Sequence, residues 1–222
     1  MSMMLNLFSI FDFYTFFFTN WVSSLLCLIL IPQIYWLMNS RYIYLIDKFI
    51  NLLWMEFLVI MVNKYNLNNL FYFIVLFIMI MFNNFMGLFP YIFTSSSHLV
   101  FSMIFSLSVW LGLMFYGWIE NTNHMLIHLV PQGTPFMLMF FMVFIESLSN
   151  LIRPMTLCIR LTANMIAGHL LLTLLSSFIP SFYLYLIIFL LQLLLLLLEI
   201  GVSLIQSYVF VILMILYFKE TN

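Results

Sequence analysis

Charged residues are scarce in this chain of 222 residues, and that scarcity limits what the chain can be. Only 6% of its residues are Asp, Glu, Lys or Arg, whereas soluble domains carry about 25%. Hydrophobic residues make up 66%, and the mean hydropathy is +1.20. We therefore predict an integral membrane protein. Six Lys plus Arg stand against seven Asp plus Glu, so there is no basic surface for nucleic acid.

Cysteines are equally scarce, and the motifs of cofactor and metal sites are missing. Cys27 and Cys158 both lie in apolar runs, which argues against a disulfide framework. No glycine-rich phosphate loop, nucleophile elbow or HExxH motif occurs, so we expect no cofactor and no metal. Glu120, His124 and His128 are spaced four residues apart and would form a stripe of zinc-type ligands on one helix. Their place in a connection between spans favours a solvated interfacial face over a metal site.

Apolar runs separated by polar connections predict membrane-spanning helices of about 20 residues. We expect such spans at residues 21–38, 70–89 and 99–119. Residues 41–64 differ because they contain charged side chains that would make a span costly. These are Arg41, Asp47, Lys48, Glu56 and Lys64. An interfacial amphipathic helix is therefore predicted for 41–64.

Two further apolar segments, residues 135–178 and 182–218, are too long for simple spans. As helices they would measure about 66 and 55 Å, against a hydrocarbon core of about 30 Å. We expect two strongly tilted helices that meet at residues 176–180; broken helices, with Pro154 as the break, or protruding ones are the alternative. The predicted fold class is all-α: one polytopic membrane domain, residues 1–222, with spanning helices, an interfacial helix and a tilted C-terminal hairpin.

Positively charged residues mark the inner side of a membrane protein. Arg41, Lys48 and Lys64 cluster in the first connection, and Lys219 lies near the C-terminus. With the N-terminus outside and five alternating spans, both groups fall on the inner side, which is the orientation we predict.

An arginine lies deep within the apolar sequence of the first long segment. A guanidinium at the bilayer centre costs at least about 2.5–3.5 kcal/mol, and Arg160 cannot escape by losing its proton. Glu146, Arg153 and Arg160 lie within about 40° of one another on a helix, so Glu146 can offset Arg153. Arg160 has no carboxylate within four residues. We therefore expect its neutralising group on another helix or on another protein.

Small and amide residues accompany Arg160 on this polar face. They are Asn150, Thr156, Ala163, Asn164 and Ala167, which include the only two alanines in the chain. Small residues let a neighbouring helix approach closely. Static packing explains the alanines taken alone, but beside an unpaired arginine they favour a moving or exchangeable partner.

A second group of titratable residues lies further along the hairpin. His169 follows Arg160 toward the outer end, while Glu199, Ser203 and Gln206 share one face of the last segment. A histidine opposite a glutamate in an apolar setting suits a proton relay. The alternative is an interhelical hydrogen bond that satisfies both side chains.

These residues carry a family resemblance. The sequence RLTANMIAGHLL at residues 160–171, preceded by FIESLSNLIRP at 144–154, resembles subunit a of mitochondrial F-type ATP synthases, in the form found in insects. NFMGLFPY at 84–91, HLVPQGTP at 128–135 and IQSYVF at 205–210 are similar to that family as well. The likeness covers most of the chain from about residue 20.

The resemblance implies a proton-translocating stator subunit in the mitochondrial inner membrane, with its N-terminus in the intermembrane space and its C-terminus in the matrix. Its partners would be a ring of c subunits, other membrane and peripheral-stalk subunits, and lipids. It would not be an enzyme on its own.

The resemblance also assigns roles to individual residues. Arg160 and Asn164 would face the ring carboxylates, with Gln206 as a polar partner. His169 and Glu199, with Ser203 beside Glu199, would form the outer half-channel. Glu146 would serve the matrix half-channel. The rival functions are a structural assembly subunit and a stand-alone proton or ion transporter.

Overall fold

The computed structural model describes residues 11–12, 19–31, 38, 40–61, 67–89, 92–130, 133, 135–177 and 182–221. Within these residues there are seven α-helices and no strand. Four helices are long and apolar enough to cross a membrane: Asn68–Gly87, Leu99–Glu120, Phe136–Ser177 and Tyr185–Thr221. The prediction of an all-α, polytopic membrane protein is confirmed.

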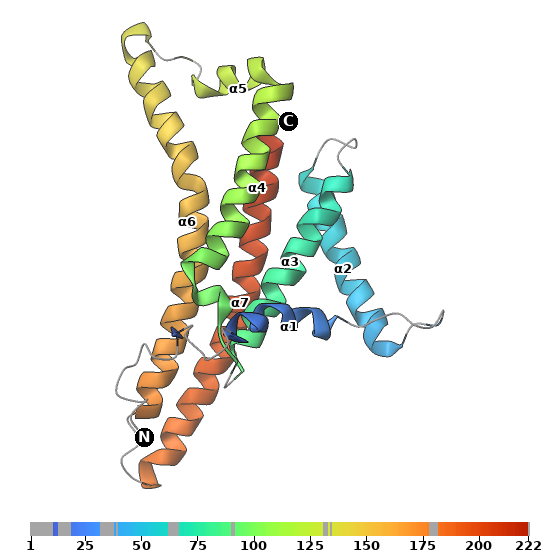
Figure 1. The fold of residues 1–222 in the computed structure, drawn as a ribbon, viewed down its shortest axis with the longest axis vertical. Coiled ribbons are helices and arrows are strands. Elements are labelled where there is room, and N and C mark those ends of the chain that lie inside the picture. The colour runs from blue at the N-terminus through green and yellow to red at the C-terminus, as the bar shows by residue number, and fades with distance from the viewer. Residues whose placement is uncertain are drawn as a thin grey trace.

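The helices follow one another with short connections between them (Figure 1). In order, they are η3 (Thr19–Val22), α1 (Ser23–Leu30), α2 (Arg41–Ile60), α3 (Leu67–Gly87), η5 (Ser95–Ser97), α4 (Leu99–Glu120), α5 (Thr122–Leu129), α6 (Phe136–Ser177) and α7 (Phe182–Thr221). The helices α3, α4, α6 and α7 lie in the intervals where the sequence predicts the last four spans.

Only part of the first predicted span lies among the described residues. The turn η3 and helix α1 give an apolar helix over Asn20–Leu30, about half of the 20 or so residues that a span needs. Residues 32–37, in the second half of the predicted span 21–38, lie outside the described residues. That span stays a prediction.

Helix α2 is capped and packed on one side. The Ser40 hydroxyl accepts a hydrogen bond from the backbone N–H three residues on, which satisfies one of the free donors at the helix start. Leu53 and Phe57 are its buried residues, and it packs against α3 and α7. It carries four charged residues and is not among the candidate spans. Residues 62–66 lie outside the described part, and the interfacial position predicted for 41–64 stays a prediction.

Helices α6 and α7 are the long helices that the sequence predicts. They contain 42 and 40 residues, about 63 and 60 Å at 1.5 Å per residue. Helix α6 continues through Pro154, so the alternative of a break there is wrong. A proline removes one N–H donor from the helix, and membrane helices tolerate that loss. Figure 1 shows the two helices antiparallel. Residues 178–180 of the expected meeting point, 176–180, lie outside the described residues.

The hydrophobic core lies between α2, α3 and the second half of α7. Its largest fully buried apolar side chains there are Phe57, Leu70, Phe73, Val211, Met214 and Ile215. In the first half of α7, by contrast, most side chains from Tyr185 to Leu198 are exposed. The second half of α7 therefore holds it in the fold, while its first half presents an apolar surface to lipid or to another protein.

The packing of α2 can be tested at Phe57. This side chain is 0% exposed, and its ring stacks on Tyr208 of α7 with 6.3 Å between ring centroids. Phe57→Ala leaves a cavity, so we expect it to lower the free energy of unfolding by about 3–5 kcal/mol. Met55→Ala, at a side chain that is 63% exposed, should change it by less than about 0.5 kcal/mol. Thermal unfolding of the purified protein measures both, and equal losses would contradict this packing.

Candidate functional site

Arg160 lies near the middle of α6 and is exposed. Thr156, Ala163 and Ala167 are exposed along the same side of the helix, and we call these four residues the Arg160 face. Within the described residues, no ion pair joins Arg160 to a carboxylate. The described helices of this chain therefore supply no carboxylate partner for Arg160.

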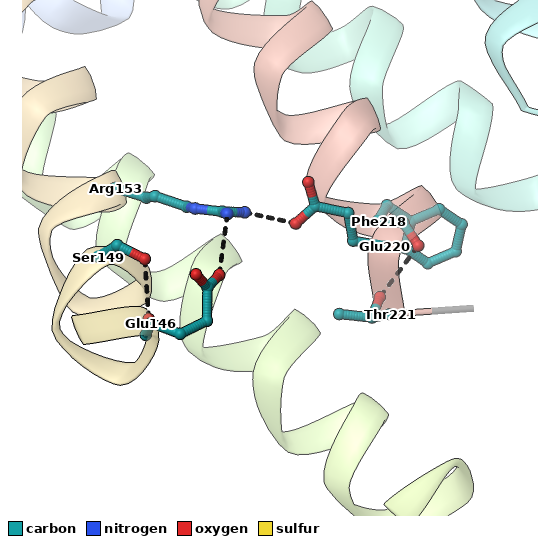
Figure 2. A network of polar contacts seen from close by, with 6 residues as sticks. All are labelled: Glu146, Ser149, Arg153, Phe218, Glu220 and Thr221. Carbon is teal, nitrogen blue, oxygen red and sulfur yellow. Dashed lines mark hydrogen bonds and ion pairs between the residues drawn. The ribbon is translucent and has the colours of Figure 1, made fainter. Parts of the chain in front are cut away.

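Arg153 lies two turns before Arg160 on α6 and is paired twice (Figure 2). Its Nη2 lies 3.7 Å from Oε1 of Glu146, which confirms the expected ion pair. Its Nη1 donates a hydrogen bond to Oε2 of Glu220, near the end of α7. The guanidinium also lies over the Tyr217 ring, with Cζ 5.2 Å from the ring centroid. Arg153 is thus neutralised within the chain, whereas Arg160 has no such partner among the described residues.

Glu220 is a residue that the sequence reasoning missed. The antiparallel register of the hairpin contains the signal that could have found it. Glu199 on α7 lies opposite Gly168 on α6. Because the helices are antiparallel, the residue 21 positions after Glu199 lies opposite the residue 21 positions before Gly168. These two residues are Glu220 and Ser147. Ser147 is the neighbour of Glu146, so Glu220 belongs near the Glu146–Arg153 pair.

The paired arginine lines a cavity of about 520 Å³ between α4, α5, α6 and α7. Its charged lining comes from Glu146, Arg153 and Glu220, with Tyr217 and Asn150 beside them. We call this space the Glu146 cavity. It gives the carboxylates of Glu146 and Glu220 room for water beside a fixed positive charge.

Glu199 is buried at the other end of the hairpin. The residue is only 7% exposed, and neither carboxyl oxygen has a hydrogen-bond partner among the described residues. A Cβ built on Gly168 would lie 2.8 Å from Oε1 of Glu199, so the missing side chain is what lets this carboxyl lie against α6. The structure therefore brings Glu199 to the residue that precedes His169.

One ring nitrogen of His169 is also without a partner. Its Nε2 is buried and has no hydrogen-bond partner among the described residues, and its ring meets Phe11 edge to face at 6.4 Å. The alternative in which His169 and Glu199 satisfy each other is thus not seen in the described part of the chain. Two titratable groups lie near each other with unused hydrogen-bonding capacity, which suits water-mediated proton transfer.

The remaining predicted site residues lie on the facing sides of the hairpin. Ser203 is buried, and its hydroxyl donates to the Ile200 carbonyl at 2.7 Å. Gln206 and Asn164 are half-buried. Their side chains make no hydrogen bond with other described residues.

Two asparagines form a polar site that the sequence reasoning did not single out. Asn83 and Asn84 are 3% and 1% exposed, yet the amide nitrogen and oxygen of each lack partners among the described residues. They lie near the end of α3, which packs against η5 (Ser95–Ser97), and η5 packs against α6. A pair of amides in an otherwise apolar span was the available signal. Buried amides of this kind require water or an unseen partner.

The stripe of Glu120, His124 and His128 does not form on one helix. Helix α4 ends at Glu120, and Asn121 leaves the helical conformation with φ −126° and ψ 51°. His124 and His128 then lie on α5, with their ring centroids 4.5 Å apart. In the described residues no group of three His, Cys, Asp or Glu side chains could hold a metal ion. His128 instead lines the Glu146 cavity.

A family model described as ATP synthase A chain matches residues 13–219. The chain belongs to the ATP synthase A chain family. It is 54% identical to ATP synthase subunit a of Drosophila melanogaster over 224 residues, which cover 99% of this chain and 100% of the relative. It is 52% identical to that of Anopheles gambiae over 226 residues, 99% and 100% of the two chains, and 52% identical to that of Locusta migratoria over 241 residues, 98% and 99%.

These matches confirm the resemblance to the subunit a family and the likeness to insect members. Together with the four long apolar helices, they make the chain a membrane subunit of an ATP synthase complex. The unpaired Arg160, the Glu146 cavity and the buried Glu199 are therefore features of a protein that works within this complex.

The contact between Gly168 and Glu199 can be tested directly. Gly168→Ala forces the Glu199 carboxyl away, and we expect the variant to be about 1 kcal/mol less stable than the same substitution at an open helical position. Glu199→Asp withdraws the carboxyl by one methylene, so the double variant should recover part of that loss. Gly201→Ala is the matched control, since a Cβ there meets nothing within 4 Å. Thermal unfolding of the variants measures the coupling, and additive losses from Gly168→Ala and Glu199→Asp would refute the contact.

Proposed function

We propose that this chain is the stator subunit that carries protons through the membrane part of ATP synthase. Two half-channels, offset from each other, would load and unload protons on the carboxylates of a rotating ring of c subunits. The observation that carries this function is the contrast between the two arginines of α6. Arg153 has two carboxylate partners, whereas Arg160 is exposed beside small residues and has none among the described residues.

Arg160 would act as the barrier between the half-channels. A proton that moved past this permanent positive charge would meet electrostatic repulsion, so water alone could not conduct it. A carboxylate on a separate helix could carry the proton instead, because Arg160 attracts it once it is ionised. Asn164 and Gln206 would offer hydrogen bonds to the carboxylate as it passes. The small residues of the Arg160 face support a close approach by that helix.

Glu199 and His169 would form the outer half-channel, with Ser203 one turn beyond Glu199. Their buried atoms without partners support a path that contains water. The unpartnered amides of Asn83 and Asn84 on α3 support water elsewhere among the helices as well. A proton arriving from outside would be held at Glu199 and passed on to the ring.

The Glu146 cavity would form the inner half-channel. Glu146 receives the proton that the ring releases, and Glu220 shares the same guanidinium and the same cavity. A proton that leaves either carboxyl for a cavity water restores the ion pair with Arg153. The cavity beside these two carboxylates has room for water, which supports a path for the proton on this side.

The proposed setting is the mitochondrial inner membrane, with the N-terminus in the intermembrane space and the C-terminus in the matrix. Partners would be the c ring, other membrane and peripheral-stalk subunits, and lipids; nucleotide chemistry would belong to other subunits. Each proton crossing 100 mV releases about 2.3 kcal/mol, several times RT of about 0.6 kcal/mol. That difference is large enough to bias rotation in one direction.

Arg160→Ala tests the barrier. In ATP synthase reconstituted into liposomes, we expect ATP-driven proton pumping to fall to background, because the charge that attracts ring carboxylates is gone. Arg41→Ala removes an exposed arginine at the start of α2 and should leave pumping unchanged. Pumping at the normal rate by Arg160→Ala would refute the role, and loss of the assembled complex without uncoupling would indicate an assembly function instead.

Glu199→Gln tests the outer half-channel. The amide cannot take up and release a proton, so we expect proton flux to fall about a hundredfold when the outer proton concentration is limiting. Flux should be measured over a range of outer pH at fixed inner pH. Glu56→Gln, at an exposed carboxylate on α2, is the control and should behave as wild type. Unchanged flux in Glu199→Gln at limiting outer protons would contradict the relay.

A further inference from the structure

The Glu146 cavity has two walls of opposite character. One wall is apolar and aromatic and comes mainly from α4, with Trp110, Phe115 and Trp118 as its largest rings. The other wall contains the charged groups of α6 and α7, namely Glu146, Arg153 and Glu220. Its volume of about 520 Å³ falls in the range of about 300–1,000 Å³ that is typical of small-molecule sites. A proton path needs only room for water, so the aromatic wall calls for another explanation.

The charged wall has an excess of negative charge. Two carboxylates meet a single guanidinium, which gives a formal charge of −1 when both are ionised. The guanidinium is already engaged by both carboxylates and by the Tyr217 ring. Each carboxylate has about four lone-pair sites, so its oxygens can still accept hydrogen bonds after they have paired with Arg153. The unused capacity of this wall is therefore for a cationic hydrogen-bond donor, not for an anion.

The aromatic wall adds to this preference. Indole faces attract cations more strongly than other aromatic side chains do, and they also pack well against apolar rings. A compound that carries its charge at one end and an apolar body at the other would match both walls. The charged end would reach Glu220 and Glu146, and the body would lie along Trp110 and Trp118.

We propose that the Glu146 cavity binds amphiphilic organic cations, in which a protonated amine is attached to an aromatic or branched apolar body. The amine donates hydrogen bonds to the two carboxylates that Arg153 does not saturate. Such a compound would occupy the space that the inner half-channel uses. Binding itself does not depend on that proton path, so affinity and proton transport can be measured separately.

The probe is monodansylcadaverine, a primary amine whose dansyl emission rises in an apolar site. It is titrated into the purified ATP synthase complex, and unlabelled amine is added to measure the competable part of the signal. Wild type should bind it saturably. The N-acetylated form of the same compound has no charge and should bind at least about tenfold more weakly, because it cannot make the charged hydrogen bonds.

Variants of the charged wall give the sharper result. Glu220→Gln should weaken binding of the amine about tenfold, whereas Arg153→Gln should tighten it, since the competing cation is gone. A merely structural role would weaken binding in both. The control is Glu56→Gln on α2, whose oxygen can still accept the Tyr208 hydroxyl, and it should match wild type. Trp118→Leu should weaken binding through the other wall.

Several outcomes would overturn this site. The first is equal binding of the amine and its N-acetylated form. The second is the absence of saturable binding because another subunit fills the cavity. The third is equal affinity of the amine for wild type, Glu220→Gln and Arg153→Gln. The comparison of the two probes on wild type needs no variant, so it remains decisive if a variant does not assemble. If the amine binds and proton pumping is unchanged while it is bound, the result supports the binding site and counts against the cavity as the inner half-channel.

Discussion

One unpaired guanidinium constrains the rest of this structure. Arg160 keeps its charge at any physiological pH, and in a membrane that charge must be met by a partner or by water. In the described part of the chain, the carboxylates of Glu146 and Glu220 pair with Arg153, and Glu199 is buried. The fold thus keeps its own acids away from Arg160. Under the proposed function, this leaves Arg160 available to an acid of the c ring.

The contact of α6 with α7 makes this separation possible. Gly168 lets the two helices approach at Glu199, and the Arg153–Glu220 pair joins them again toward the end of α7. Between these two points, Arg160 faces outward from α6. Because α6 is continuous through Pro154, the spacing of its polar groups is set by helix geometry and not by a flexible joint.

Local features of this fold could be predicted from the sequence, and distant ones could not. Apolar length located the four long helices, and a spacing of seven residues on one helix was enough to predict the ion pair of Glu146 with Arg153. Glu220 was missed because it is 67 residues from Arg153, so only the register of the hairpin brings the two together. The short helix α5 was missed because its eight residues include Thr and Asn, which have weak helix propensity. Its contact with the cavity depends on packing that no local pattern encodes.

The distances along α6 explain why a moving partner is needed. His169 and Arg153 are 16 residues apart, about 24 Å along the helix, which approaches the thickness of the hydrocarbon core. Arg160 lies between them, roughly 10 Å from Arg153 and 13 Å from His169 along the axis. Neither gap can be closed by a hydrogen bond, which spans about 3 Å. A chain of waters could close both, but it would have to pass the fixed charge of Arg160. The described residues thus contain two separate titratable sites, and under the proposed function a carboxylate of the c ring would carry the proton between them.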